Sequence, residues 1–201
     1  VKYMSDITTR VSVLGESIYP HLNKPDVRFN DWGEFKVTLK VGKQDASAMV
    51  KLFDQAIEDS LATAEKEAKG KKVKPAPKPY KVEADNVFFK FKMRASGTNK
   101  KTNEKFSQRP ALFDAKKNPI PASQSIWGGS LMKVAYQLIP YNSPAIGAGV
   151  SARLKAAQII KLVEGKDKDV FKEEDGFEVT KKEETNSNEK ANAEIQAGSD
   201  F

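Results

Sequence analysis

The sequence contains no cysteine and only one histidine among its 201 residues. Without cysteine there are no disulfides, no zinc–cysteine sites and no thiol nucleophiles, and this composition is typical of a protein from a reducing compartment. The single histidine, His21, cannot form the histidine pairs that many metal sites use. We therefore expect no metal and no cofactor, and we interpret His21 as a loop residue that makes a backbone hydrogen bond.

Long apolar runs and catalytic groups are also missing. No stretch approaches the roughly 20 apolar residues that a membrane-spanning helix needs, and no apolar signal segment opens the chain. Gly147 and Gly149 lie at the start of a predicted strand and are not followed by a helix, so they do not form a phosphate-binding loop. Acidic pairs such as Glu173 and Glu174 fall in a polar tail, where no burial would raise their pKa. We expect a soluble intracellular protein that has no membrane partner and is not an enzyme.

The chain does have an unevenly distributed excess of positive charge. Its formal net charge is +7, from 34 basic and 27 acidic side chains. Residues 165–201 hold eleven acids and six lysines, which leaves residues 1–164 with a net charge of +12. A basic body with an acidic tail is expected when the body binds a polyanion and the tail imitates one. Surplus lysine that merely keeps the fold soluble is the alternative, and charge alone does not separate the two.

Alternation of apolar and polar residues predicts five to six β-strands. Residues 17–33, between the first two strands, contain two prolines and predict a long loop. The last strand loses its alternation near Gln158, which indicates a bulge or full burial. Residues 105–114 are interpreted as the hairpin partner of residues 87–95. The predicted strands are residues 7–14, 34–41, 87–95, 105–114, 131–139 and 148–163.

One segment changes to a helical period. Residues 46–69 predict an amphipathic helix, which Asp45 can cap at its start and Gly70 can end. The apolar side chains recur every four residues, at Met49, Phe53, Ile57 and Leu61.

The order of these elements favours a mainly β fold, a small closed antiparallel barrel with one inserted helix, because no βαβ rhythm is present. The barrel domain is expected to span residues 1–164. Within it, residues 70–84 form a basic, proline-rich connector, interpreted as a stiff surface loop that cannot be helix or inner strand. From Gly165 onward periodicity disappears, and residues 165–201 are predicted to be a disordered, mildly acidic tail.

The outward faces of the predicted strands carry cations beside aromatic rings. Proteins hold single-stranded nucleic acid in this way, with cations on the phosphates and rings stacked on bases at roughly 1–3 kcal/mol per base. Duplex recognition is less favoured because the predicted helix lacks a basic face. The candidate residues are the cations Lys36, Lys40, Lys90, Lys92, Arg94, Lys133, Arg153 and Lys155, and the rings Trp32, Phe88, Trp127 and Tyr141. An outward cation is usually just solvated, and each ring is equally consistent with a loop-packing anchor.

Several segments resemble those of one protein family. Residues 128–164, GGSLMKVAYQLIPYNSPAIGAGVSARLKAAQIIKLVE, are similar to a segment of the single-stranded DNA-binding proteins of podovirus-type bacteriophages. Further matches are NKPD (23–26), the GEFKVTLKV strand, FKFKMRAS (89–96) and a chain that ends in Asp200 and Phe201. The resemblance runs from about Ile7 to Glu164, with the last two residues in addition.

The resemblance implies an OB-fold that binds single-stranded DNA without sequence preference, in phage DNA replication and recombination, in the cytoplasm of the infected host. It also implies a monomer or weak homodimer whose tail, through Asp200 and Phe201, contacts the phage DNA polymerase or helicase–primase and competes with DNA. In this chain lysines interrupt the tail, so it is only mildly acidic. An OB module that binds RNA or docks an acidic protein on its basic face is the alternative.

Overall fold

The computed structural model describes residues 7–99 and 102–164. The chain divides into two compact units, Val1–Lys166 and Asp167–Phe201, and the second of these lies outside the described residues. The predicted tail and its Asp200 and Phe201 therefore lie outside them too. No helix in the described part is long and apolar enough to span a membrane.

The described elements are ten strands and one helix. In chain order they are β1 (Arg10–Val11), β2 (Gly15–Asp26), β3 (Glu34–Gly42), α1 (Lys43–Glu67), β4 (Tyr80–Glu83), β5 (Asn86–Arg94), β6 (Ser96–Thr98), β7 (Lys105–Ser107), β8 (Ala111–Phe113), β9 (Leu131–Ser143) and β10 (Gly147–Lys161).

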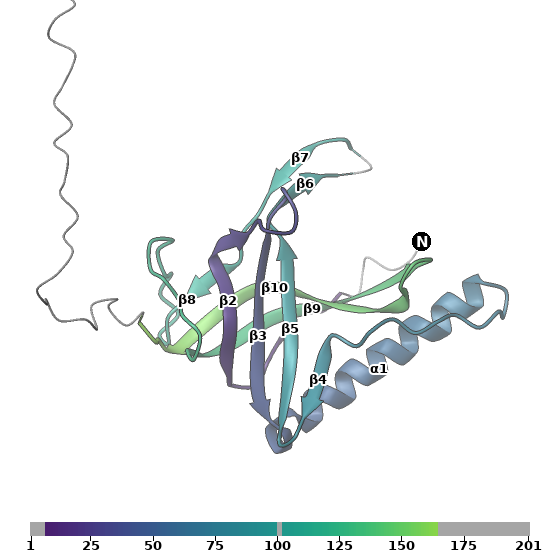
Figure 1. Cartoon of the computed structure of the whole chain (residues 1–201), viewed down its shortest axis with the longest axis horizontal. Helices are drawn as coiled ribbons and strands as arrows, with labels where there is room; N and C mark the ends of the chain where they lie inside the picture. Colours follow the sequence, from purple (N-terminus) through teal and green to yellow (C-terminus); the bar gives the residue numbers. More distant parts are fainter. Residues whose placement is uncertain (1–6, 100–101, 165–201) are drawn as a thin grey trace, which may run out of the picture. The chain divides into compact units, whose positions relative to one another are not determined.

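Five of the strands close into a barrel. β2 pairs with β3, β3 with β5, β5 with β10, β10 with β9, and β9 returns to β2. In Figure 1, β2, β3 and β5 stand side by side, and β9 and β10 cross behind them. A five-stranded, partly open barrel of this kind is the OB-fold, which confirms the predicted mainly β barrel. Among the described strands, two pairings are parallel and not antiparallel, those of β10 with β5 and β8.

The central strands alternate as their sequences predict. In β3, Phe35, Val37, Leu39 and Val41 are buried, and in β5 their partners across the pair are buried as well. Residues paired across two strands lie on one face of the sheet, so these side chains form a single core layer. The ring of Phe53 in α1 packs on this layer, with its centroid 5.2 Å from that of Phe89.

β2 occupies much of the segment whose sequence predicts a loop. That prediction, for residues 17–33, rested on Pro20 and Pro25, and it is wrong for residues 17–26. The pairing of β2 with β3 is irregular on both sides of His21, so neither proline replaces a residue of a regular ladder. His21 is accordingly a strand residue and not a loop residue. The first strand is also shorter than predicted, because β1 covers only two residues of the range 7–14.

The predicted hairpin between residues 87–95 and 105–114 is also wrong. β5 pairs with β3, β4 and β10, whereas residues 105–114 divide into β7, which pairs with β6, and β8, which pairs with β10. Pro110 lacks the N–H that a continuous strand needs and lies between these two short strands. The hairpin partner of β5 is instead β4, the edge strand that the end of the connector forms.

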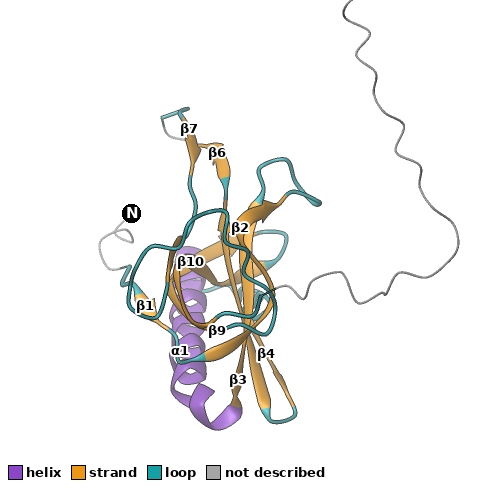
Figure 2. Ribbon diagram, turned by 90° about the vertical axis from the view of Figure 1, so that its left-hand side faces the viewer, coloured by secondary structure: helices purple, strands orange, loops and turns teal. Residues whose placement is uncertain are grey.

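α1 begins three residues before its predicted start. Asp45 lies in the first turn without a capping hydrogen bond, and Gly42 holds the capping position. The buried stripe passes through Ser60 and Ala64 and leaves Leu61 half-buried, because a helix turns every 3.6 residues and not every four. The Ser60 hydroxyl donates to the Gly149 carbonyl at 2.8 Å. This bond and the packing of Phe53 hold α1 along β9 and β10 (Figure 2).

A bulge in β10 changes which of its residues face the core. Ala152 and Leu154 are buried, but further along the strand Ala157 and Ile159 are buried instead. Leu154 pairs with Tyr136 of β9, and the next pair is Ala156 with Ala135, so β10 advances by two residues while β9 advances by one. Lys155 is therefore the extra residue of the bulge. The predicted irregularity near Gln158 is confirmed, with register shifts on either side of it.

Candidate nucleic-acid interface

The pairing of the central strands builds a row of cations on the outside of the barrel. Lys36 in β3 lies opposite Lys92 in β5, and Lys92 lies opposite Arg153 in β10. Residues directly opposite each other on adjacent strands have Cβ atoms about 5 Å apart, and like charges at such positions destabilise a sheet. A row of three cations across three adjacent strands is therefore unfavourable in isolation and favours an anion above it.

This row lies in two adjoining hollows. The first, which we call the basic hollow, has a volume of ≈ 600 Å³, and the cations that line it are Arg28, Lys36, Lys90 and Lys92. The second, the Tyr141 hollow, has a volume of ≈ 540 Å³ and is lined by Lys92, Arg94, Phe106, Tyr141 and Arg153, among others. Lys92 and Glu34 line both hollows, so the two adjoin at this pair.

A third hollow continues the first at its other end. This Tyr19 pocket has a volume of ≈ 520 Å³ and lies between β2 and residues 126–129. Tyr19 and His21 line both this pocket and the basic hollow, whereas Trp127 lines only the pocket. The three hollows thus follow one another across the outer surface of β10, β5, β3 and β2.

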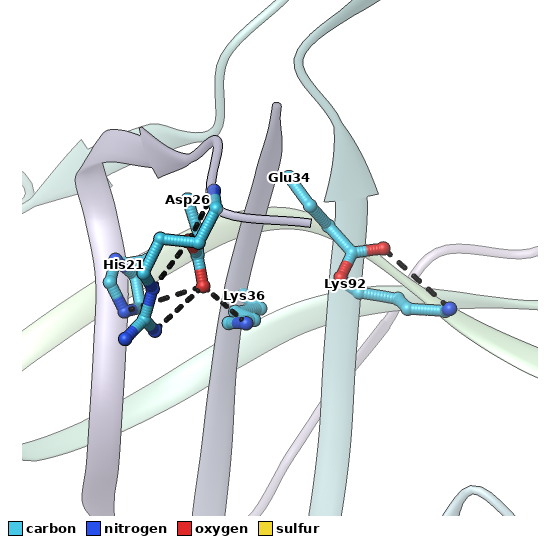
Figure 3. A network of polar contacts seen from close by, with 6 residues as sticks. His21, Asp26, Glu34, Lys36 and Lys92 are labelled. Atoms are coloured by element: carbon cyan, nitrogen blue, oxygen red, sulfur yellow. Dashed lines mark hydrogen bonds and ion pairs between the residues drawn. The ribbon is translucent and has the colours of Figure 1, made fainter. Parts of the chain in front are cut away.

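A buried acid organises the cations of the basic hollow. The Asp26 side chain is only 2% exposed, and its carboxylate lies 2.7 Å from Lys36 Nζ and 2.9 Å from an Arg28 guanidinium nitrogen. The Arg28 backbone N–H also donates to it at 3.1 Å, and His21 Nε2 lies 4.0 Å away (Figure 3). The hydrogen bonds from Arg28 and Lys36 hold the pKa of Asp26 far below its usual range.

Acidic neighbours offset only part of the positive charge. Besides Asp26, Glu34 lies 3.6 Å from Lys92, as Figure 3 also shows. The basic and Tyr141 hollows are lined by six cations, which are Arg28, Lys36, Lys90, Lys92, Arg94 and Arg153. Six cations against two acids leave an excess of positive charge along a continuous surface, as expected for a polyanion site.

Exposed aromatic rings stand next to these cations. The ring of Trp32 lies 5.5 Å from the Arg94 guanidinium. Phe29, 81% exposed, lies 5.5 Å from Lys36 Nζ and 5.6 Å from the Arg28 guanidinium. Rings therefore lie beside cations on this surface, so bases and phosphates of one strand can be bound together.

The structure brings together eight of the twelve predicted residues. Seven of them line the three hollows, which are Lys36, Lys90, Lys92, Arg94, Trp127, Tyr141 and Arg153. Trp32 joins them through its contact with Arg94.

The other four predicted residues lie outside the hollows. Lys40 is 3.3 Å from Glu16, and Phe88 lies between Lys40 and Lys81 on the neighbouring strands. Lys155 is the bulge residue of β10. Lys133, on β9, lies opposite Gln158.

Tyr19, Arg28, Phe29 and Phe106 belong to this surface but were not among the predicted residues. The first three lie in or just after β2, in the segment interpreted as a loop, and Phe106 lies in the segment assigned to the wrong hairpin. The sequence VRF directly after NKPD was an available signal, because it places a cation beside a ring next to a matched motif. Within the described residues there is no cluster of three or more side chains that could hold a metal ion.

An OB-type barrel with a basic, ring-lined outer surface is the architecture of single-stranded nucleic-acid-binding modules. The family model of the single-stranded DNA-binding protein of bacteriophage T7 matches residues 15–162, and the chain belongs to this family. The single-stranded DNA-binding protein of Enterobacteria phage T3 is 33% identical, with 72% of this chain and 71% of that protein covered. The protein of the same name from Escherichia phage T7 is 32% identical over the same shares.

Solved structures agree with this assignment. The crystal structure of gp2.5, a single-stranded DNA-binding protein encoded by bacteriophage T7, superimposes with a TM-score of 0.71 and 28% identity, covering 86% of this chain and 99% of that one. The single-stranded DNA-binding protein of bacteriophage Enc34 in complex with ssDNA has a TM-score of 0.54 at 18% identity, covering 78% and 88%. The Enc34 likeness shows the shared fold.

Proposed function

We propose that this protein binds single-stranded DNA without sequence preference, and that it protects such DNA during phage replication and recombination in the cytoplasm of the infected host. The row Lys36, Lys92 and Arg153 carries this proposal, because it crosses three strands inside two adjoining hollows. A flexible single strand follows such a surface with its phosphates on the cations and its bases on the rings. The T3 and T7 relatives are named for the same activity.

A salt titration tests the phosphate contacts. If all six cations of the two hollows meet phosphates, the logarithm of the association constant for oligo-dT should fall against the logarithm of salt with a slope of about −4. Lys92→Ala should reduce the magnitude of the slope by about 0.7, since one phosphate contact is lost. Lys51→Ala, which removes an exposed cation of α1, is the matched control. A flat slope for the parent protein would exclude the electrostatic groove.

A competition experiment separates this proposal from its rivals. The protein is first loaded with labelled oligo-dT. Unlabelled oligo-dT should then displace the label better than oligo-U, duplex DNA or an acidic protein does. Only a site with exposed rings gains from unstacked bases, whereas a purely electrostatic surface would also accept a duplex or a protein carboxylate. Stronger displacement by oligo-U would favour an RNA-binding module.

We also infer that the tail contacts replication proteins of the phage, its DNA polymerase or helicase–primase. Residues 165–201 carry a net charge of −5 and include Asp200 and Phe201, so they offer acidic groups and an aromatic ring to a partner. Binding of the polymerase or helicase–primase to the full chain, and its loss on removal of Asp200 and Phe201, tests this part of the proposal.

A further inference from the structure

The Tyr19 pocket has two exposed aromatic walls. Tyr19 is 84% exposed and Trp127 is 52% exposed, and both line the same ≈ 520 Å³ hollow. None of the ring contacts among residues 7–99 and 102–164 involves either of these rings. Large exposed rings that do not pack on other rings leave their faces free for a flat ligand.

The backbone at Tyr19 is held in an unfavourable conformation. Its φ is +46°, in the left-handed region that glycine adopts readily and bulky residues rarely adopt. Such strain persists only where surrounding structure fixes it, and it is concentrated at ligand-binding sites. Because the ring is almost fully exposed, burial of Tyr19 does not explain the strain.

The opposite wall is fixed to the same strand. The Ser17 backbone N–H donates to the Ser130 carbonyl at 2.9 Å, and the Ser17 carbonyl accepts from the Gly129 N–H at 2.8 Å. The Ser17 hydroxyl donates to the Trp127 carbonyl at 3.2 Å. Gly129 adopts a φ of +89°, which glycine tolerates. The segment that carries Trp127 is therefore attached to β2 two residues from Tyr19, so the pocket is formed before a ligand binds.

We propose that the Tyr19 pocket is a nucleobase subsite, which takes one unstacked base of a single strand between Tyr19 and Trp127. This proposal rests on the proposed function. His21 and Tyr19 line both the pocket and the basic hollow that holds Arg28 and Lys36. A strand whose phosphates lie on these two cations reaches the mouth of the pocket with its next nucleotide. Binding there depends on the base, whereas binding in the basic hollow depends on the phosphate charge.

An abasic oligomer separates the two contributions. Trp127→Ala should weaken binding of oligo-dT about 5- to 150-fold, as expected for the loss of one stacked base. Binding of an abasic oligomer with the same number of phosphates should not change, and neither should the salt slope with oligo-dT, since no cation is removed. Tyr19→Ala should weaken oligo-dT binding in the same way as Trp127→Ala. Tyr19→Phe should retain affinity for oligo-dT because the aromatic ring remains. Val82→Ala, which trims an exposed side chain of β4, is the control.

A second variant fills the pocket and keeps both rings. A Cβ added to Gly128 would have Ser17 O as its nearest neighbour, at 3.8 Å, so a side chain fits there without a backbone clash. Gly128→Leu should therefore fold normally and lose oligo-dT affinity as Trp127→Ala does. Photocrosslinking of the parent protein with an oligonucleotide that contains 5-iodouracil should label Tyr19 or Trp127.

The outcomes distinguish this subsite from the general function. If the parent protein binds oligo-dT with the expected salt slope but the folded pocket variants bind it equally well, the subsite is excluded and the proposed function stands. Equal losses on oligo-dT and on the abasic oligomer, or crosslinks confined to other rings, also exclude the subsite. If the parent protein does not bind oligo-dT, the proposed function itself is excluded.

Discussion

Asp26 shows how one buried acid can serve a basic surface. Its carboxylate accepts hydrogen bonds from the Arg28 guanidinium and from the Arg28 backbone, and it pairs with Lys36 at 2.7 Å. These contacts place both cations beside the exposed ring of Phe29. The acid therefore limits the conformations of two long side chains that would otherwise lose more entropy on meeting a phosphate.

Asp26→Asn should destabilise the fold in a pH-dependent way. The pKa of Asp26 is lowered in the folded state by Arg28 and Lys36, so its ionised form stabilises the fold above the unfolded pKa of about 4. This stabilisation is lost as the pH falls below about 4 toward the folded pKa. The difference between parent and variant should thus be full at pH 7 and shrink in acid, as measured by urea unfolding between pH 7 and pH 2.5.

Asp31→Asn provides the control for this measurement. Asp31 is an exposed acid in the turn that follows β2, and its removal should leave the free energy of unfolding nearly unchanged. A constant difference between Asp26→Asn and the parent across the whole pH range would show that Asp26 acts through packing and not through its charge.

At the scale of elements, close backbone contact joins the connector to the hairpin of β9 and β10. Ala148 exchanges two backbone hydrogen bonds with the connector, donating to Lys74 and accepting from Ala76. Gly147, at the start of β10, has a φ of +99°, and a Cβ on it would lie 2.1 Å from the Lys74 carbonyl oxygen. Only glycine therefore permits this pairing, which holds the proline-rich segment against β10.

Gly147→Ala should lower the free energy of unfolding by more than Gly70→Ala. Both glycines have positive φ, which costs an alanine about 1–2 kcal/mol, but nothing lies within 4 Å of a Cβ on Gly70. Urea unfolding of the two variants therefore isolates the clash with Lys74, which we expect to add about 1–3 kcal/mol. Equal losses for the two variants would mean that the connector moves away from β10 without cost.

At the scale of the whole molecule, charge is divided between the barrel segment and the tail. Residues 1–164 carry a net charge of +12, and residues 165–201 carry −5. We expect an acidic segment that is tethered to a cationic surface to compete with DNA, at an effective concentration that the length of the tether sets. Such competition is electrostatic, so salt weakens it.

Deleting residues 165–201 should therefore tighten oligo-dT binding at low salt. The gain should shrink as salt rises, because screening weakens the tail and the DNA alike. Fluorescence anisotropy at two salt concentrations measures it. A tail in which five of the eleven acids are replaced by their amides has as many acids as lysines and no net charge, so it is the matched variant and should reproduce the gain. Unchanged affinity in both variants would leave the tail with no part in DNA binding.

The sequence by itself determined the faces of β3 and β5. Alternation with a period of two is a local property of an extended backbone, so Phe89 and Phe91 could be placed inward, and Lys90 and Lys92 outward, without knowledge of any neighbour. The helical period of α1 and the division of charge along the chain are likewise readable from single segments. These features sufficed to predict a mainly β barrel with a cationic outer surface.

Only the tertiary structure decided which strands became neighbours. β2 was hidden by its two prolines, which the irregular pairing around His21 accommodates. Arg153 and Lys155 both occupy outward positions in the alternating sequence pattern. Only Arg153 keeps a paired position in the sheet, because Lys155 is the extra residue of the bulge. Burial of Asp26 and strain at Tyr19 also depend on residues far away in the chain. Pairing over long separations is fixed by closure of the whole barrel, which no single segment encodes.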